Sequence, residues 1–294
     1  MSYQAYNVAR LHIRDLAFKL KYFRRKLSEG KKRDRPLVLC NSYPKSGTHL
    51  LYQILHSLPG LLKWDDIVSV QALCGIINTA NHIRWKIGSA PDGSIVRSHL
   101  MYCEEIRSIL KEEQCKVIFI YRDLRDVALS HARWVTKESR IFLHDIYLQE
   151  ENFDRQLMCS IKGVPIGTPF GSNLSQPDIG QDFLRWKGWI EDTDTLAVKF
   201  EDLIGQRGGG SEQKRIEMVE KIVSYLNVDL LSNQIKDKFS SYIMNPKESH
   251  TFIKGGKGRK GGWEETFKET HKEAFKKVAG ELLIELGYEN NMNW

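Results

Sequence analysis

A strand-sized apolar run followed by a glycine-containing loop and a helical pattern is the feature that most constrains this chain. LVLCNS at 37–42 is rich in strand-forming residues, YPKSGTH follows at 43–49, and LLYQILHSL at 50–58 has apolar residues at helical spacing. This order predicts a strand, a tight loop and a helix. The N-terminus of a helix offers unpaired N–H groups and a partial positive charge, which together favour an anion. We therefore predict a phosphate-binding loop at this position.

The same alternation of buried strand and helix recurs further along the chain. VIFIY at 117–121 precedes the helical pattern RDLRDVALSHARW, and TLAVKF at 195–200 precedes a helical stretch around 212–226. Such alternation is typical of an α/β fold with a central parallel sheet flanked by helices. We find no internal repeat or second core pattern, so we expect a single domain over residues 34–294. Residues 163–180 are crowded with Gly, Pro, Ser and Asn, which predicts a long surface loop.

Residues 1–33 are expected to form a basic amphipathic helix and a linker that precede this domain. The apolar residues that share one helical face are Ile13, Leu16, Leu20, Phe23 and Leu27. Stripes of this kind usually face a core, and we expect this one to dock on the domain. A basic amphipathic helix also suits an anionic membrane surface, so peripheral membrane contact stays open.

Charge and cysteine content exclude some classes of protein and leave others open. The formal net charge of +7 is compatible with nucleic acid, a membrane surface or small anions as partners. Five cysteines without a CxxC pair argue against a disulfide framework or a zinc site. No apolar run reaches the ~20 residues of a spanning helix, and no secretory signal is recognisable. We expect a soluble, cytoplasmic protein.

The 43–49 loop differs from the loop of ordinary nucleotide-binding kinases. Gly47 permits close backbone approach, Ser46 and Thr48 supply hydroxyls, and Lys45 supplies a positive charge. In a Walker A loop, GxxxxGK[ST], the lysine follows the last glycine, whereas Lys45 precedes Gly47. This order argues against an ordinary kinase, although a P-loop-type small-molecule phosphotransferase remains the rival enzyme. A basic module that binds nucleic acid or a membrane is the rival from another class.

YPKSGT after the first strand resembles the 5′-phosphosulfate loop of the cytosolic-type sulfotransferases. These enzymes use 3′-phosphoadenosine-5′-phosphosulfate (PAPS) as donor. Arg122 and Ser130 in RDLRDVALS match the family's 3′-phosphate motif, in which an arginine closes a strand and a serine lies on the next helix. They stand eight residues apart in the sequence, a little over two helical turns, so both can reach one anion. The resemblance implies a bacterial-type member that acts on small molecules.

KGRKGGWEETF at 257–267 resembles the family's C-terminal segment that covers the nucleotide. The residues that match without a gap are Lys257, Gly258, Gly261, Trp263 and Phe267. In this register the family's arginine falls on Gly256, so Arg259, or Lys254 through a two-residue shift, is left to supply the missing charge. The resemblance therefore implies nucleotide contacts from Lys257, Gly258 and Arg259.

His99 in IVRSHLMY corresponds to the histidine that the family presents to the acceptor after a strand. The resemblance implies that His99 is the general base, a role that its ordinary pKa near 6.5 suits. Lys45 would stabilise charge on the leaving nucleotide. The implied reaction is in-line transfer of a sulfuryl group from PAPS to a hydroxyl, or an amine, of a small-molecule or natural-product acceptor. It releases adenosine 3′,5′-bisphosphate and requires no metal.

Three further positions are assigned to nucleotide binding by the resemblance. Phe200 in VKFEDL matches an aromatic residue near the adenine, and a core position is equally open to it. His49 and Leu50 stand where the family commonly has Thr-Trp, so we expect weaker adenine stacking and a phosphate contact from His49. The family's dimer motif KxxxTVxxxE is not kept, because the corresponding stretch reads EETFKETHKE. The oligomeric state is therefore open, and no nucleic-acid partner is expected.

Overall fold

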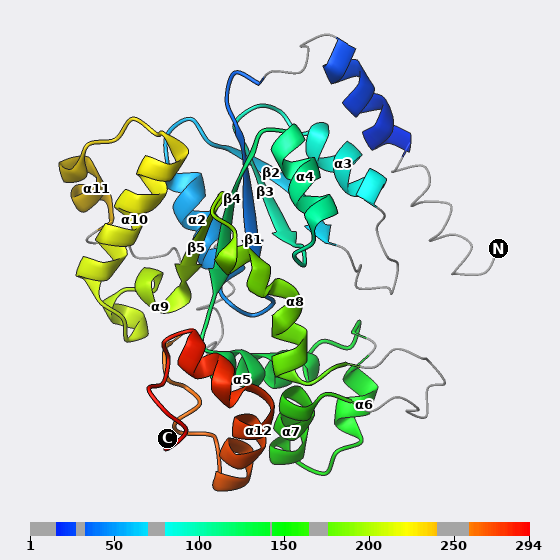
Figure 1. Ribbon diagram of the computed structural model, residues 1–294, viewed down its shortest axis with the longest axis vertical. Helices are drawn as coiled ribbons and strands as arrows, with labels where there is room; N and C mark the ends of the chain where they lie inside the picture. Colours follow the sequence, from blue (N-terminus) through cyan, green and yellow to red (C-terminus); the bar gives the residue numbers. More distant parts are fainter. Residues whose placement is uncertain (1–15, 28–32, 70–79, 142, 165–175, 240–258) are drawn as a thin grey trace.

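A five-stranded parallel sheet forms the centre of the molecule. The computed structural model describes residues 16–27, 33–69, 80–141, 143–164, 176–239 and 259–294. The sheet order is β2-β3-β1-β4-β5, and each neighbouring pair is parallel. The strands are β1 (Leu37–Ser42), β2 (Leu62–Ser69), β3 (Ser94–His99), β4 (Cys115–Tyr121) and β5 (Thr195–Lys199). The predicted single α/β domain with a central parallel sheet is confirmed (Figure 1).

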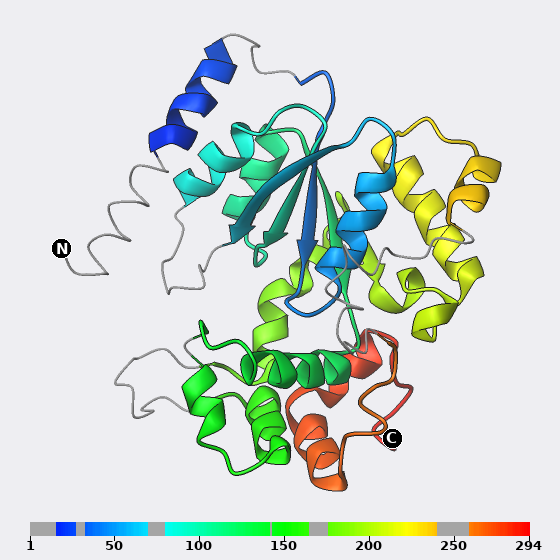
Figure 2. The same cartoon turned by 180° about the vertical axis from the view of Figure 1, so that it is seen from behind.

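Helices cover both faces of this sheet. Helices α2 (Thr48–Ser57), α9 (Phe200–Leu203), α10 (Glu212–Leu226) and α11 (Ser232–Phe239) lie on one side, and α3 (Ala80–Gly88), α4 (Glu104–Glu112) and α8 (Ile179–Glu191) lie on the other (Figures 1 and 2). A separate layer at one end of the sheet holds α5 (Leu124–Val135), α6 (His144–Leu148), α7 (Phe153–Lys162) and α12 (Glu269–Glu285). This helical layer begins directly after β4, so it stands over the carboxyl ends of the strands.

The period of two along each strand explains why both faces need helices. All six residues of β1 are buried. Leu37 and Leu39 join one hydrophobic cluster, whereas Val38 and Cys40 join the cluster on the opposite face. Because successive side chains of a strand point to opposite faces, such a continuous apolar run is stable only when both faces are covered.

Most of the sequence-based elements are found where they were expected. The predicted strands at 117–121 and 195–200 and the helix at 212–226 correspond to β4, β5 and α10. The strand β2 was missed, because LKWDDIVS carries two aspartates and lacks an apolar run. Only the ends of the predicted 163–180 loop lie in the described residues, where an isolated bridge joins Val164 to Gln176.

The order in which strands are added to the sheet changes side at β1. From β1 it proceeds to β2 and β3 on one side, and then crosses to β4 and β5 on the other. In open parallel sheets, ligands bind at the carboxyl ends of the strands where the order reverses. This point lies between β3, β1 and β4, and the three strands end at His99, Ser42 and Tyr121.

A helix over residues 16–27 precedes the sheet and packs on the domain beside α3 and α4 (Figure 1). Our expectation that its apolar stripe faces the core is wrong. Leu20 and Leu27 are 61% and 87% exposed, and the buried residues are Phe18 and Arg25 on the opposite face. A buried ion pair of 2.8 Å between Arg25 and Glu113 holds the face of Arg25 against the domain, and the apolar stripe therefore points outward. The predicted stripe residue Ile13 lies outside the described residues, and the boundary at residue 33 stays a prediction.

No helix among the described residues is long and apolar enough to cross a bilayer.

Candidate active site

The loop between β1 and α2 has the backbone of an anion-binding site. Lys45 and Gly47 both adopt positive φ angles, 69° and 103°. A non-glycine residue in this region is strained by ~1–2 kcal/mol, and such strain gathers at functional sites. The helix α2 begins at Thr48 and has no side-chain cap. The N–H groups of its first turn therefore have no intrahelical acceptor and are available to an anion.

Gly47 is required by a close approach of Phe200. A Cβ atom at position 47 would lie 2.5 Å from Cδ2 of Phe200, well inside van der Waals contact. Phe200 is fully buried at the start of α9. The ring therefore packs against the loop at Gly47. Because the ring has no exposed face, this structure gives no support to the prediction that Phe200 stacks on adenine.

Ser46 lies within the loop and has a buried hydroxyl group. Its side chain is fully buried, and Oγ makes no hydrogen bond within the described part of the chain. A buried hydroxyl without a partner costs ~1–3 kcal/mol. The uncapped helix and this hydroxyl fit the terminal phosphosulfate of a nucleotide, which would supply acceptor oxygens to both.

Lys45 carries a charge that the protein keeps poorly solvated. Nζ lies 4.7 Å from the ring centroid of Trp134 on α5. Burial, and then the charge of Arg122, lower the pKa of Lys45 to about 8. The charge of Lys45 in turn lowers the pKa of His99 and of His131. Lys45 is therefore close enough to Arg122 and to His99 for their charges to influence one another.

His99 is held in one tautomer by the end of β1. Its Nδ1 lies 3.0 Å from the carbonyl oxygen of Ser42 and 3.1 Å from the hydroxyl of the same residue. Because a carbonyl oxygen only accepts, Nδ1 carries the proton and Nε2 carries the lone pair. Burial is the main cause that lowers the pKa of His99 below 6.5, followed among the lowering causes by Lys45 and Arg97. His99 is therefore neutral at pH 7 and able to accept a proton at Nε2.

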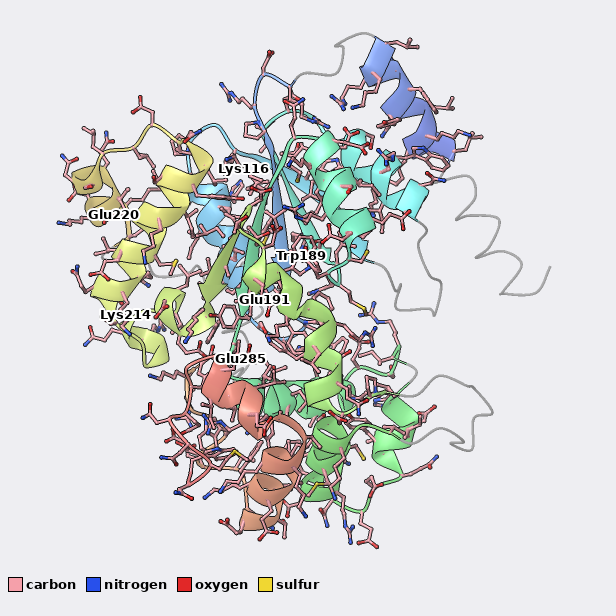
Figure 3. The ribbon with its side chains drawn as sticks, in the orientation of Figure 1. Lys116, Trp189, Glu191, Lys214, Glu220 and Glu285 are labelled. Atoms are coloured by element: carbon pink, nitrogen blue, oxygen red, sulfur yellow. The ribbon has the colours of Figure 1, made fainter. Side chains whose placement is uncertain are left out.

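Asn41 binds both residues that flank His99. Its Oδ1 accepts hydrogen bonds from the Ser98 hydroxyl (2.8 Å) and from the Leu100 amide (2.9 Å), and its Nδ2 donates to the Leu100 carbonyl (3.0 Å). Trp189 of α8, labelled in Figure 3, donates from Nε1 to the same carbonyl at 2.7 Å. His99 is thus held by a strand end whose flanking residues are hydrogen-bonded.

Arg122 directly follows the last residue of β4. Its guanidinium lies 4.4 Å from the ring centroid of Phe200, and Nη2 donates to Asp126 (3.0 Å) and to the Arg259 carbonyl (2.6 Å). Nε of Arg122 is buried and has no partner among the residues that the structure describes. This free donor fits a second anion. Ser130, two turns along α5, is partly exposed, and within the described part of the chain its hydroxyl forms no hydrogen bond to Arg122.

Asp126 joins the C-terminal segment to this arginine. Its carboxylate accepts hydrogen bonds from the backbone N–H of Gly261 (2.9 Å) and of Trp263 (3.0 Å). Arg259 of the same segment pairs with Glu265. The predicted contacts Lys257 and Gly258, and the alternative Lys254, lie outside the described residues.

Arg125 contacts the same C-terminal segment through Trp263. Its guanidinium lies 3.8 Å from the ring centroid of Trp263 and 4.5 Å from that of Trp294. It also pairs with Asp123 (2.8 Å) and Glu289 (2.5 Å). Residues far apart in the sequence therefore fix the segment that follows Arg259.

Two predicted nucleotide contacts occupy less direct positions. Leu50 is 1% exposed and packs in the hydrophobic cluster beneath α2. His49 is partly exposed in the first turn of α2. Sequence reasoning missed His131, whose Nδ1 lies 3.0 Å from the Ser160 hydroxyl and whose pKa is lowered to about 4 by burial and by Lys45. Its position one residue after Ser130 was the available signal.

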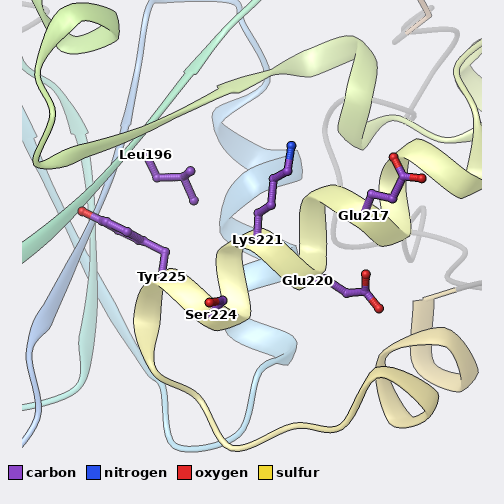
Figure 4. Close-up of a pocket in the computed structure, with 6 residues that line it drawn as sticks. All are labelled: Leu196, Glu217, Glu220, Lys221, Ser224 and Tyr225. Carbon is purple, nitrogen blue, oxygen red and sulfur yellow. The ribbon is translucent and has the colours of Figure 1, made fainter.

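One surface hollow lies away from these residues. It has a volume of about 600 Å³ and lies between β5 and α10 (Figure 4). Its lining consists of Leu196, Glu217, Glu220, Lys221, Ser224 and Tyr225. None of these belongs to the site, so we assign the hollow no part in the reaction. Among the described residues no cluster of His, Cys, Asp and Glu could hold a metal ion.

The fold and site define an enzyme that transfers a group from a nucleotide with two separate anionic ends. The β1–α2 loop and the region of Arg122 offer two separate places for an anion, and His99 is a neutral histidine whose pKa is lowered by burial and by Lys45. A family model described as sulfotransferase domain matches residues 35–287, and the chain belongs to this family. The predicted PAPS-dependent sulfotransferase is confirmed, and the phosphotransferase alternative is not favoured.

Relatives of known activity and of known structure agree with this assignment. The flavonol 3-sulfotransferase of Flaveria bidentis is 23% identical over 268 residues, 84% of this chain and 81% of the relative. The flavonol 4′-sulfotransferase of Flaveria chlorifolia is 25% identical over 272 residues, 87% and 82% of the two chains. A mouse sulfotransferase complexed with PAP has a TM-score of 0.56 at 19% identity over 88% of each chain. Retinol dehydratase with androsterone and PAP has a TM-score of 0.50 at 14% identity, covering 90% of this chain and 85% of its own.

Proposed function

We propose that His99 and Lys45 catalyse direct sulfuryl transfer to a hydroxyl group of a small aromatic acceptor. His99 accepts the hydroxyl proton at Nε2 while the acceptor oxygen forms a bond to sulfur. The bond between sulfur and the bridging oxygen of the nucleotide breaks, and Lys45 stabilises the negative charge that this oxygen gains. The observation that carries the proposal is the hydrogen bond from Nδ1 of His99 to the Ser42 carbonyl, which reserves Nε2 as the acceptor.

We assign the two ends of the donor nucleotide to two groups of residues. The 5′-phosphosulfate is bound by the 45–50 loop, where Lys45, Ser46, Gly47 and Thr48 supply charge, hydroxyls and N–H groups, and His49 adds a ring nitrogen. The 3′-phosphate is bound by Arg122 and Ser130, with Lys257, Gly258 and Arg259 from the C-terminal segment. Phe200 supports both groups, because it contacts the loop at Gly47 and the guanidinium of Arg122. Leu50 acts through packing beneath the loop.

An aromatic hydroxyl is the acceptor class that the site supports best. Trp134 is partly exposed and lies against Lys45, so an aromatic face stands beside the reacting group. The two relatives named above are flavonol sulfotransferases. A phenol also loses its proton more readily than an alcohol, which suits a histidine whose pKa is lowered. An amine acceptor is the alternative that the same geometry admits.

For the compartment we propose the cytoplasm, with any membrane contact confined to the N-terminal helix. Four of the five cysteines lie in the described residues, where Cys40, Cys103, Cys115 and Cys159 are all free thiols. Unpaired thiols are usual in a reducing compartment.

A labelled-donor assay tests the proposed reaction. Wild-type protein is incubated with [³⁵S]PAPS and equal concentrations of matched phenols, alcohols and amines, and labelled products are counted. We expect transfer to phenols, and the same protein with His99→Gln should bind adenosine 3′,5′-bisphosphate normally while turnover is largely lost. Turnover confined to amines would contradict the aromatic hydroxyl. Retention of turnover in His99→Gln would contradict the base.

A further inference from the structure

The N-terminal helix, residues 16–27, is attached to the domain by one face. Phe18 is 7% exposed and packs edge-on against His82 of α3 and Trp64 of β2, with ring centroids 6.3 Å apart in both pairs. Arg25 donates from Nε to the Gly88 carbonyl at 2.6 Å and pairs with Glu113 at 2.8 Å. Phe18 and Arg25 are about two helical turns apart on the same face, so their contacts fix which face points away from the protein.

The face that points away is apolar. Its residues are Leu16, Leu20, Phe23 and Leu27, exposed by 56%, 61%, 48% and 87%. We call these four residues the outer stripe. They follow a 4-3-4 spacing, which places them on one side of a helix. They are four of the nine large apolar side chains that the described residues expose, gathered on twelve residues.

Positive charge borders the outer stripe on both sides. Lys19, Lys21 and Arg24 are exposed, whereas residues 16–27 contain no Asp or Glu. At 100° per residue, Lys19 and Arg24 fall on opposite sides of the stripe. Lys26 turns inward and pairs with Glu113 at 3.0 Å. The surface therefore combines an apolar centre with a basic border.

We propose that the outer stripe binds an anionic lipid surface. An apolar helix face with basic residues at its border is the pattern of helices that lie in the membrane interface. A second copy of the chain fits less well, because pairing two outer stripes would bring Lys19, Lys21 and Arg24 of both copies together. Acidic lipid headgroups neutralise these charges, and each basic residue near such a surface strengthens binding roughly fivefold.

The position of the helix leaves the active site open during membrane contact. The helix rests on α3 and on the turn between α4 and β4, at the end of the sheet where β4 begins. Lys45, His99 and Arg122 lie at the opposite ends of their strands. Figure 1 shows the helix at one extremity of the molecule and the α5, α7 and α12 layer at the other. The inferred role is attachment, and catalysis does not depend on it.

Vesicle co-sedimentation of the full chain tests the proposal. The probes are vesicles of phosphatidylcholine and vesicles of phosphatidylcholine with phosphatidylserine. We expect wild type to sediment with the second kind, and raised salt to release it because exposed charges are screened. The variant Leu20→Glu/Phe23→Glu should lose at least about tenfold in partition, since burial of each apolar side chain contributes about that factor. Leu27→Glu, at the most exposed position, should lose less in the same direction.

A matched control separates the outer stripe from exposed apolar residues in general. Leu148→Glu/Leu231→Glu replaces two other exposed leucines, at 52% and 63%, and should sediment like wild type. Turnover of a water-dissolved phenol should be unchanged in all variants, whose side chains lie outside the reaction site. The proposal is overturned if Leu20→Glu/Phe23→Glu sediments like wild type or if phosphatidylserine makes no difference. It is also overturned if light scattering shows a dimer that this variant dissociates, because the occupant is then a second copy.

Discussion

Arg122 and Asp126 form a buried ion pair of 3.0 Å, and the same carboxylate accepts the backbone N–H groups of Gly261 and Trp263. Asp126 therefore connects the arginine proposed for the 3′-phosphate with the segment proposed to cover it. The two parts of the nucleotide site are joined before any ligand arrives.

Asp126→Asn should reduce selectivity for the 3′-phosphate. An amide cannot accept all three hydrogen bonds as strongly as a carboxylate, and bonds to charged groups contribute ~1.5–3 kcal/mol each. We expect affinity for adenosine 3′,5′-bisphosphate to fall about tenfold or more, while affinity for AMP, which lacks this phosphate, stays constant. Isothermal titration with both nucleotides measures the ratio, with Asp202→Asn as control. An equal loss for both nucleotides would indicate general unfolding and contradict a positioning role.

Lys45→Met should weaken nucleotide binding and raise stability at neutral pH. Burial and Arg122 lower the pKa of Lys45 from 10.5 to about 8, so the unfolded chain binds more protons between these values. The free energy of unfolding of wild type therefore rises with pH in this window relative to the variant. The stability advantage of Lys45→Met should be greatest below pH 8 and shrink toward pH 10. Denaturant titrations at pH 7 and pH 10 compare the two proteins, and a constant difference would contradict the lowered pKa.

Turnover should decrease toward acid pH as His99 gains a proton. Because burial lowers the pKa of His99 below 6.5, the active neutral form persists to a lower pH than for an exposed histidine. The acid limb of kcat should therefore lie below pH 6.5. His99→Gln should lack this limb and be slower by ~10²–10⁴. The check is kcat against pH at saturating PAPS, and an acid limb that survives in His99→Gln would assign it to another group.

Gly47→Ala should be far more damaging than Gly209→Ala. Both glycines have positive φ, 103° and 83°, so alanine is strained by ~1–2 kcal/mol at either position. Only position 47 adds a collision, because its Cβ would lie 2.5 Å from Phe200, whereas the nearest atom at position 209 is 3.8 Å away. We expect Gly47→Ala to lose bisphosphate binding and Gly209→Ala to keep it. Thermal melts with and without the nucleotide distinguish the two, and equal ligand-induced shifts would count against this reading of the loop.

The C-terminal basic residues should contribute unequally to the 3′-phosphate site. In the gap-free alignment Lys257→Ala weakens bisphosphate binding more than Lys254→Ala, and the opposite order would support the shifted alignment. Arg259→Ala provides the third comparison, because its carbonyl already contacts Arg122 while its side chain pairs with Glu265. Titration of the bisphosphate into the three variants gives the order.

The phosphate loop could be predicted because its information is local. Strand, loop and helix occupy 37–57 without interruption, and the helix N-terminus follows from the chain alone. The support of His99 could not be predicted, since Asn41 and the Leu100 that it holds are 59 residues apart. Neither residue type points to this contact by itself. Asn41 and Leu100 become neighbours only because β1 pairs in parallel with β3.

The N-terminal helix shows a different limit of sequence reasoning. Periodicity identifies which residues share a face, and it assigned the apolar face correctly to Leu16, Leu20, Phe23 and Leu27. It does not say which face is turned inward. That choice depends on Glu113, which is 88 residues from its partner Arg25 and whose side chain is only 1% exposed.

Arg125 contacts both Trp263 and Trp294, and these two rings pack edge to face, so residues near position 294 matter for the proposed nucleotide site. A fusion partner or affinity tag placed next to Trp294 would disturb this aromatic cluster and, through Trp263, the backbone that Asp126 holds. Anyone producing the enzyme should place a purification handle elsewhere. The η1 turn (Gln206–Gly208) is closed by its own backbone hydrogen bonds, but Gly208 also accepts from Lys260 at 2.9 Å, so it is no safer as an insertion point.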